Sequence, residues 1–258
     1  MVDMKILKYF LSFENKGKPY LALSLFFFCI HSFAKSYEVI NDDGWRVVKK
    51  EKGYIIYEKI EKKAGILPLR VTGVINAPLD SIMESLRNVE GQVKWTPDLI
   101  IKKTLKDLGP RAAITYSVTD LPWPIYDRRL VLHNELFLDR KRKLLFVVSK
   151  TLKFPQTPKT KKTIEAFVGY SNIGFRPINK RKTYVEFTAL IGPKGSIPTW
   201  IVNFFQQGWP VNFLRSLEKN ALKNPKKLRP GLSDMVSQLL DLMKLDQKMF
   251  GHLAKQKN

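Results

Sequence analysis

The feature that most constrains this chain is a series of strand-like segments that begins near residue 112 and is interrupted only by short turns. In residues 112–119 the even positions are apolar, and the odd positions carry alanine, threonine or serine. This period of two is typical of a strand with two different faces. Further strand-like segments follow at 128–138, 143–151, 163–175 and 182–191. Serial strands joined by short turns favour antiparallel pairing, because parallel neighbours need long crossover connections.

Helical patterns flank this series on both sides. Strand-like segments at 45–63 and 69–75 precede Pro78, which suits the first turn of a helix with an apolar stripe. After Pro198, apolar residues recur at helical spacing to about Lys219. We therefore expect an α+β fold, in which a curved antiparallel sheet with one short helix near its start and one long helix at its end encloses an interior.

The remaining patterns divide the chain into three parts. With 44% hydrophobic and 12% aromatic residues, the chain can bury a sizeable core, which we place in residues 35–225. Residues 226–258 predict a basic linker and a second amphipathic helix, with Ser233 or Asp234 as its cap. Residues 1–34 form the third part.

Residues 1–34 have the pattern of a secretory signal peptide. Several lysines precede an apolar run over residues 20–33, and Ser32 and Ala34 are small residues of the kind that a signal peptidase reads. We expect cleavage after this segment and a periplasmic location. The alternative is an uncleaved anchor, although the run is shorter than the ~20 residues of a spanning helix. Cys29, the only cysteine, lies within this segment, so no disulfide is expected elsewhere.

The formal net charge of +22 narrows the choice of partners. A basic balance this large is typical of proteins that bind nucleic acid, an anionic membrane or an acidic partner. Export makes nucleic acid the weakest of these, and the basic residues gather in short clusters between strand-like segments, at 140–143, 159–162 and 180–182. We expect contact with an anionic membrane surface and no nucleic acid. The alternative is that these clusters only keep the turns soluble.

The common catalytic signatures are missing from the sequence. It has no phosphate-binding glycine loop, dinucleotide fingerprint, nucleophile elbow or two-histidine metal motif. His133 is the one histidine within the expected sheet, and no acidic residue lies at a sequence spacing that would indicate an acid–base pair with it. We therefore expect no catalytic residue, no metal and no cofactor.

The segment 120–130 has an unusual composition. Two prolines bracket Trp123, which makes a stiff and exposed loop with an aromatic tip. The strand that follows places Arg128 and Asn134 on one face together with four leucines. A buried guanidinium needs a partner. That partner is either a bound ligand or an acid such as Asp127.

Three motifs stand out in the sequence: Trp95 after the first expected helix, the segment from Pro122 to Arg129, and the run from Gly192 to Asn203. Together they resemble motifs of the START family, the lipid-transfer domains related to the steroidogenic acute regulatory protein. The order of elements also matches, and the resemblance covers about Trp45 to Ala221. It implies a helix-grip fold, in which the sheet wraps the C-terminal helix and leaves a hydrophobic tunnel for one lipid. It also implies a mouth formed by the loops near 121–127 and 192–197 and by the helix start at Pro198.

The resemblance supplies two sets of candidate residues. The candidate ligand contacts are Trp95, Tyr116, Arg128, Leu130, Leu132, Asn134, Ile201 and Phe205. The candidate membrane contacts are Trp123, Ile125, Ile197 and Trp200, although Trp200 can instead pack between helix and sheet. Sterol-binding members have a carboxylate and an arginine where this chain has Ser117 and Asn134, so the resemblance does not imply sterol specificity.

The function we expect is that a monomer binds a single lipid in the tunnel and transfers or presents it at membranes. One alternative is an enzyme that acts on a hydrophobic substrate, because the broader superfamily includes cyclases and aromatases. Its candidate residues are His133, Tyr116 and Arg128. Another is an adaptor that transfers nothing and uses the helix in 226–258.

Overall fold

The computed structural model describes residues 44–59, 68–121, 123, 125–158, 160, 162–192, 194, 199–223 and 228–255. Side chains are described for these residues except 199–207 and 245–255. The expected signal segment 1–34 lies outside the described residues.

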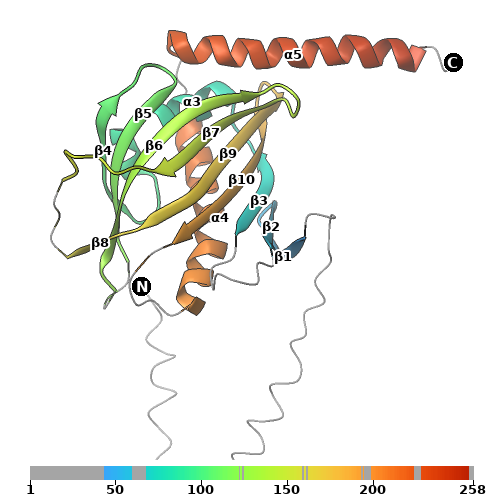
Figure 1. Cartoon of the computed structure of the whole chain (residues 1–258). Coiled ribbons are helices and arrows are strands. Elements are labelled where there is room, and N and C mark those ends of the chain that lie inside the picture. The colour runs from blue at the N-terminus through green and yellow to red at the C-terminus, as the bar shows by residue number, and fades with distance from the viewer. Residues whose placement is uncertain are drawn as a thin grey trace, which may run out of the picture. The chain divides into compact units, whose positions relative to one another are not determined.

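Ten strands of the described residues form one curved sheet (Figure 1). They are β1 (Trp45–Glu51), β2 (Tyr54–Lys59), β3 (Leu69–Ile75), β4 (Leu99–Asp107), β5 (Ala112–Thr119), β6 (Asp127–Asp139), β7 (Leu144–Thr151), β8 (Thr163–Glu165), β9 (Phe167–Asn179) and β10 (Lys182–Gly192). Their order is β1-β2-β3-β10-β9-β7-β6-β5-β4, and each pair along it is antiparallel. The short β8 pairs in parallel with β6. The expected antiparallel sheet is confirmed.

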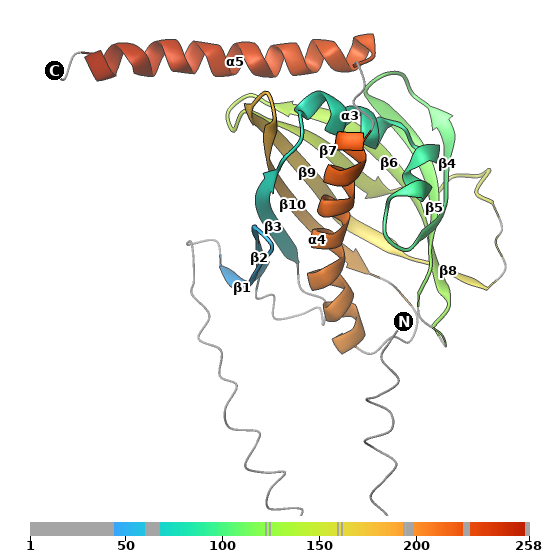
Figure 2. The ribbon, with the colours of Figure 1, turned by 180° about the vertical axis from the view of Figure 1, so that it is seen from behind.

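The helices of the described residues are α3 (Leu79–Arg87), the 3-10 helix η2 (Glu90–Lys94), α4 (Thr199–Lys223) and α5 (Pro230–Lys255). Figure 2 shows α4 lying along the concave side of the sheet, with α3 near its C-terminal end. This is the helix-grip arrangement that we expected. Within the described residues, no helix combines the length and the apolar composition needed to cross a membrane.

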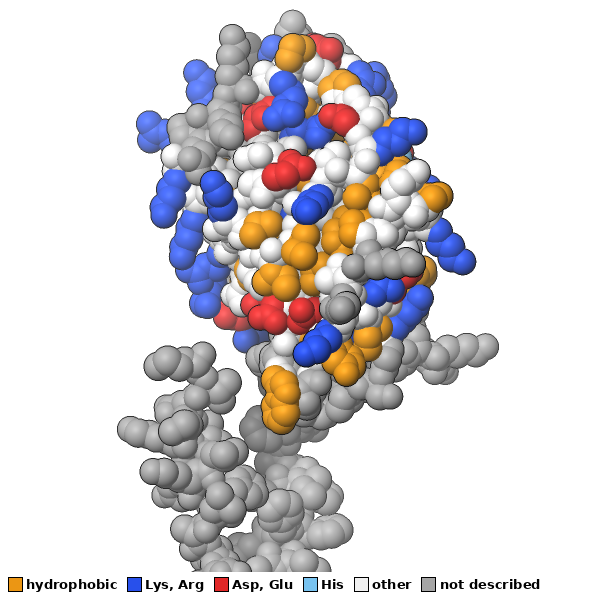
Figure 3. All heavy atoms as spheres, turned by 90° about the vertical axis from the view of Figure 1, so that its left-hand side faces the viewer, with side chains coloured by type: hydrophobic (Ala, Val, Ile, Leu, Met, Phe, Trp, Pro, Cys, Tyr) orange, Lys and Arg blue, Asp and Glu red, His pale blue; other side chains and the backbone are white. Residues whose placement is uncertain are grey.

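Basic residues occupy two of the tight turns of the sheet. The turn between β6 and β7 consists of residues 140–143, and the turn between β9 and β10 consists of residues 180–181. Figure 3 shows Lys and Arg side chains around the outline of one face, the side on which β4 and β8 lie, rather than in a single patch on it. On that face, the described basic residues therefore form no single positively charged patch.

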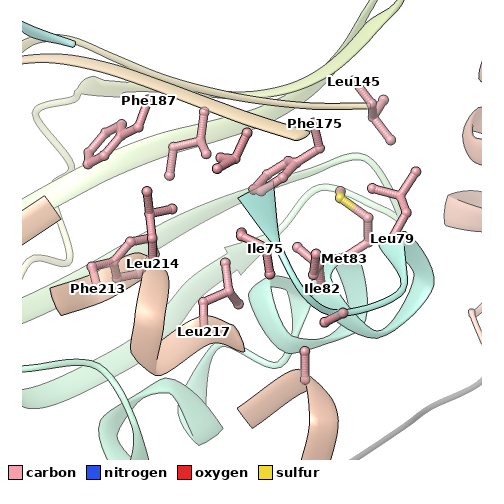
Figure 4. Packing of buried hydrophobic residues seen from close by; sticks show 14 of the residues in the cluster. Ile75, Leu79, Ile82, Met83, Leu145, Phe175, Phe187, Phe213, Leu214 and Leu217 are labelled. Carbon is pink, nitrogen blue, oxygen red and sulfur yellow. The ribbon is translucent and has the colours of Figure 1, made fainter. Parts of the chain in front are cut away.

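One hydrophobic core holds the sheet, α3 and α4 together (Figure 4). Phe175 and Phe187 project from the sheet, Ile82 projects from α3, and Leu214 and Leu217 project from α4. All five side chains are buried, four of them less than 1% exposed. Each contributes about 1.5–3 kcal/mol by leaving water. Their contacts fix where α4 lies over the sheet.

An ion pair fixes the start of α5 to α3. The Arg229 guanidinium contacts the buried carboxylate of Glu84 at 2.9 Å, and the Arg229 backbone N–H donates to the same carboxylate. Leu232 and Leu239 then join the main core. The expected second helix is thus present, but it begins at Pro230 rather than after a cap at Ser233 or Asp234. The reason is that proline suits the first turn of a helix.

Three parts of the sheet differ from the sequence expectations. The single expected segment 163–175 is divided at Ala166 into β8 and the start of β9. The single expected segment 45–63 is a hairpin of β1 and β2 in its described part. The strand β4 was not expected, because its lysines fall on both faces and hide the period of two. Its pairing with β5 is also irregular between Leu99 and Ile101 and between Thr104 and Lys106. Such bulges shift the alternation that sequence patterns rely on.

We expect Phe175→Ala to lower the free energy of unfolding by about 3–5 kcal/mol, because it opens a cavity in a closed core. Phe137→Ala is the matched control, since Phe137 is 56% exposed on β6 and should change stability by about 1 kcal/mol or less. Urea unfolding followed by circular dichroism measures both. Equal losses for the two variants would contradict the core described here.

Candidate functional site

A cavity of about 360 Å³ is lined by residues of the sheet and of α4. Its apolar lining comes from several elements: Leu130, Leu132 and Leu136 on β6, Val147 on β7, Ile173 on β9, Phe187 and Ala189 on β10, and Trp209 and Phe213 on α4. The volume falls within the ~300–1,000 Å³ range of small-molecule sites. The cavity is thus the main candidate for a ligand site.

The small residues of β5 leave room for this cavity. Ala113, Thr115 and Ser117 line it, whereas Tyr116 does not. Tyr116 is 1% exposed and belongs to a separate small core, which Leu152 and other residues cover from the opposite face of the sheet. Its hydroxyl shares a hydrogen bond of 2.5 Å with the Thr160 hydroxyl. The expectation that Tyr116 contacts a ligand therefore does not hold, because the apolar face of β5 points away from the cavity.

A neutral polar cluster forms part of the cavity wall. The Asn134 amide donates to the Thr115 hydroxyl at 2.9 Å, and the Ser149 hydroxyl donates to the Asn134 carbonyl oxygen at 2.8 Å. All three residues line the cavity. Asn134, Leu130 and Leu132 thus lie where the sequence placed them, although the Asn134 amide is already held by protein groups.

Arg128 lines the cavity where β6 begins and ties two loops together. Its guanidinium donates to the backbone carbonyl of Tyr126 and, at 3.0 Å, to that of Lys194. The side chain is 6% exposed, and this burial lowers the pKa of Arg128 while the charge of Asp127 opposes the shift. The Asp127 carboxylate accepts a bond from the Leu121 backbone N–H. Arg128 therefore connects the loop before β6 to the loop after β10.

Aromatic residues of α4 form another part of the wall. Trp209 stacks on Phe213 with ring centres 5.2 Å apart, and its indole N–H donates to the Pro97 carbonyl at 3.3 Å. Trp95 does not line the cavity but contacts Phe213 at 5.6 Å, so it supports the wall from behind. The side chains of Ile201 and Phe205 lie outside the described residues. Their helical stripe continues to Trp209 and Phe213, which our candidate set left out.

The expected mouth residues are described in part. Trp123 is 92% exposed, Ile125 is half-buried, and the neighbouring Tyr126 is 57% exposed. Ile197 and the side chain of Trp200 lie outside the described residues. Two exposed aromatic residues, Trp123 and Tyr126, thus lie close to Arg128 in the sequence.

Most charged residues of the wall escaped the sequence analysis, among them Lys102 and Asp98. Lys102 on β4 lines the cavity, and burial lowers its pKa to about 8. Below pH 8 the folded chain carries this amine in its charged form, and this lowers the free energy of unfolding. The cost fades as the pH rises towards 10.5, where an unfolded lysine also loses its proton. Asp98 lines the cavity too, and burial together with the charge of Asp120 raises its pKa.

The three residues of the enzyme alternative do not meet in the cavity. Arg128 lines it, but His133 alternates with Leu132 and Asn134 on β6 and so lies on the opposite face, as Tyr116 does on β5. In the part of the chain that the structure describes, no group of three or more His, Cys, Asp or Glu side chains is arranged to hold a metal ion.

The family model of the START domain matches residues 38–227. The chain belongs to the START domain family. An uncharacterized protein of Pseudomonas aeruginosa is 28% identical over 183 residues, which are 70% of this chain and 88% of that protein. Phosphatidylcholine transfer protein of Mus musculus is 21% identical over 187 residues, which are 71% of this chain and 86% of that protein.

Solved START structures share the fold. Human StAR-related lipid transfer protein 5 has a TM-score of 0.62 at 13% identity, and the match covers 79% of this chain and 94% of that one. A STAR-related lipid transfer protein fragment from Xanthomonas axonopodis has a TM-score of 0.60 at 21% identity, covering 69% of this chain and 99% of that one. The expected family and helix-grip fold are thereby confirmed.

Proposed function

We propose that this START protein binds a single lipid in its cavity and transfers or presents it at membranes, without catalysing a reaction. The observation that carries the proposal is the apolar cavity between α4 and the sheet, in a family whose relatives include proteins named for lipid transfer. A buried acyl chain gains about 0.8 kcal/mol per methylene, so binding needs no covalent chemistry.

The lining of the cavity supports an occupant. Most of the residues that line this volume are apolar, so an empty cavity leaves apolar surface in contact with water. Water suits a cavity where polar partners are plentiful, whereas a bound acyl chain removes apolar surface from water. An acyl chain is therefore the better occupant of this cavity.

The loop before β6 is the proposed contact with the bilayer. Tryptophan favours the interface between head groups and acyl chains, and Trp123 and Tyr126 are exposed there. Arg128 joins this loop to Lys194 and also lines the cavity. Insertion of the aromatic tip can therefore be coupled to opening of the cavity. Ile125, Ile197 and Trp200 complete the proposed edge.

The positive charge is proposed to bring the protein to anionic membranes. Each lysine or arginine close to such a surface contributes about 1 kcal/mol, and salt weakens the attraction. The scatter of basic residues in Figure 3 is also what plain solubility would need. If the charge attracts the protein to membranes, the protein should prefer anionic vesicles to neutral ones, and this preference should fall with salt.

We further propose that the protein acts as an exported monomer, with residues 1–34 as its signal.

We expect Ala189→Phe to abolish most lipid uptake, because Ala189 lines the cavity and a phenyl ring there occupies ligand space. Thr188→Phe is the matched control on the other face of β10, where the side chain is partly exposed and does not line the cavity. Uptake of a fluorescent phospholipid from vesicles, measured per folded molecule, compares the two. Normal uptake by Ala189→Phe would place the ligand elsewhere and overturn the proposal.

We expect Trp123→Ala to slow lipid transfer between vesicles severalfold while lipid content and thermal stability stay unchanged. The reason is that Trp123 is almost fully exposed and supports no core. Phe137→Ala removes another exposed aromatic residue, near the opposite end of β6, and should leave transfer unchanged. A loss of stability with normal transfer per folded molecule would instead give Trp123 a structural role.

A further inference from the structure

Lys102 lines the cavity, whereas the other two lysines of β4 do not. It pairs across the strands with Ser117 of β5, which in turn pairs with Leu130 of β6, and all three residues line the cavity. Residues directly opposite each other in a sheet point to the same face. Lys103 and Lys106 of the same strand are exposed and do not line the cavity. Solubility therefore explains those two lysines but not Lys102.

The amine of Lys102 has no partner among the described residues. No hydrogen bond or ion pair of its side chain is found there, and burial alone accounts for its lowered pKa. Two other cations of the wall have partners: Arg128 donates to two backbone carbonyls, and Arg87 contacts Asp107 at 2.9 Å. Lys102 is half-buried, and its side chain lines the cavity, where the amine has lost part of its hydration without gaining a partner among the described residues. A ligand that supplies an anion provides such a partner.

The surroundings of Lys102 add to its preference for an anion. The Ser117 hydroxyl opposite it also has no hydrogen-bond partner among the described residues, so it offers a second donor. The charged residues that line the cavity are Arg87, Asp98, Lys102, Arg111, Arg128 and Glu135. Cations thus outnumber acids in this wall, and burial and the charge of Asp120 push Asp98 towards its neutral form.

We infer that Lys102, with Ser117, binds the head group of an anionic lipid inside the cavity. The chemistry it selects is a phosphate-bearing head group with net negative charge, as in phosphatidylglycerol. This inference rests on the proposed lipid-binding function and names the class of lipid. Charge-assisted hydrogen bonds contribute enough to separate anionic from zwitterionic lipids about tenfold or more.

The test compares Lys102→Met with Lys103→Met. Both variants remove one positive charge from β4, so both weaken general attraction to anionic vesicles equally, but only the first changes the cavity. Each protein is incubated with vesicles that contain equal amounts of phosphatidylglycerol and phosphatidylcholine. The bound lipid is then identified by mass spectrometry, and melting temperatures are measured in parallel.

We expect the wild-type chain and Lys103→Met to take up mainly phosphatidylglycerol. We expect Lys102→Met to lose that preference about tenfold and to melt at a higher temperature at neutral pH, because it no longer holds a half-buried amine without a partner in the cavity wall. A merely structural lysine would lower the melting temperature when replaced. A third arm adds inorganic phosphate, which should not displace the lipid.

Three results would overturn the inference. They are a preference for phosphatidylcholine in the wild-type chain, an unchanged preference in Lys102→Met, and displacement of the lipid by inorganic phosphate, which would indicate a site for free phosphate. Each of them leaves the proposed function standing as long as a lipid is bound. Absence of any bound lipid in the wild-type chain would instead reject the proposed function itself.

Discussion

The fold depends on a mismatch between two packed surfaces. Part of the inner face of the sheet carries large apolar side chains such as Phe175, which pack closely against α3 and α4. On β5 that face carries Ala113, Thr115 and Ser117 instead, which are too short to fill the space below the helix. Protein interiors are otherwise packed at crystal density. The same core that fixes α4 therefore also holds open the volume next to it.

The placement of charge follows from this cavity. Arg128 and Lys102 belong to the same sheet and line the same cavity, but their side chains differ in their partners. Arg128 donates to backbone carbonyls of two loops, so it holds together the loops of the proposed cavity mouth. Lys102 faces Ser117 across the strands, and its amine has no partner among the described residues. In the function proposed here, an anionic head group binds Lys102, and the loops that Arg128 joins lie at the proposed contact with the bilayer.

Much of the architecture could be predicted from the sequence because its patterns are local. The period of two between 112 and 191 and the helical spacing after Pro198 give the sheet and α4 directly. On β6 the run of alternating leucines with Arg128 and Asn134 also indicates the correct inner face. The resemblance of three sequence motifs to those of START domains also indicated the family.

The rest depends on tertiary contacts that no local pattern shows. On β5 the apolar face is the outer one, because Leu152 and Phe154 cover it, and this is why Tyr116 was assigned to the wrong side. On β4 the lysines and bulges hide the strand, so Lys102 could not be placed. Trp209 and Phe213 reach the cavity only through the position of α4.

The most direct test of the account is native mass spectrometry of the full chain after incubation with phospholipid vesicles. The account predicts a single mass increment, equal to one phospholipid per chain, in the folded charge states. A folded chain that carries no lipid, or a variable number of lipids, would contradict a single cavity built for one lipid.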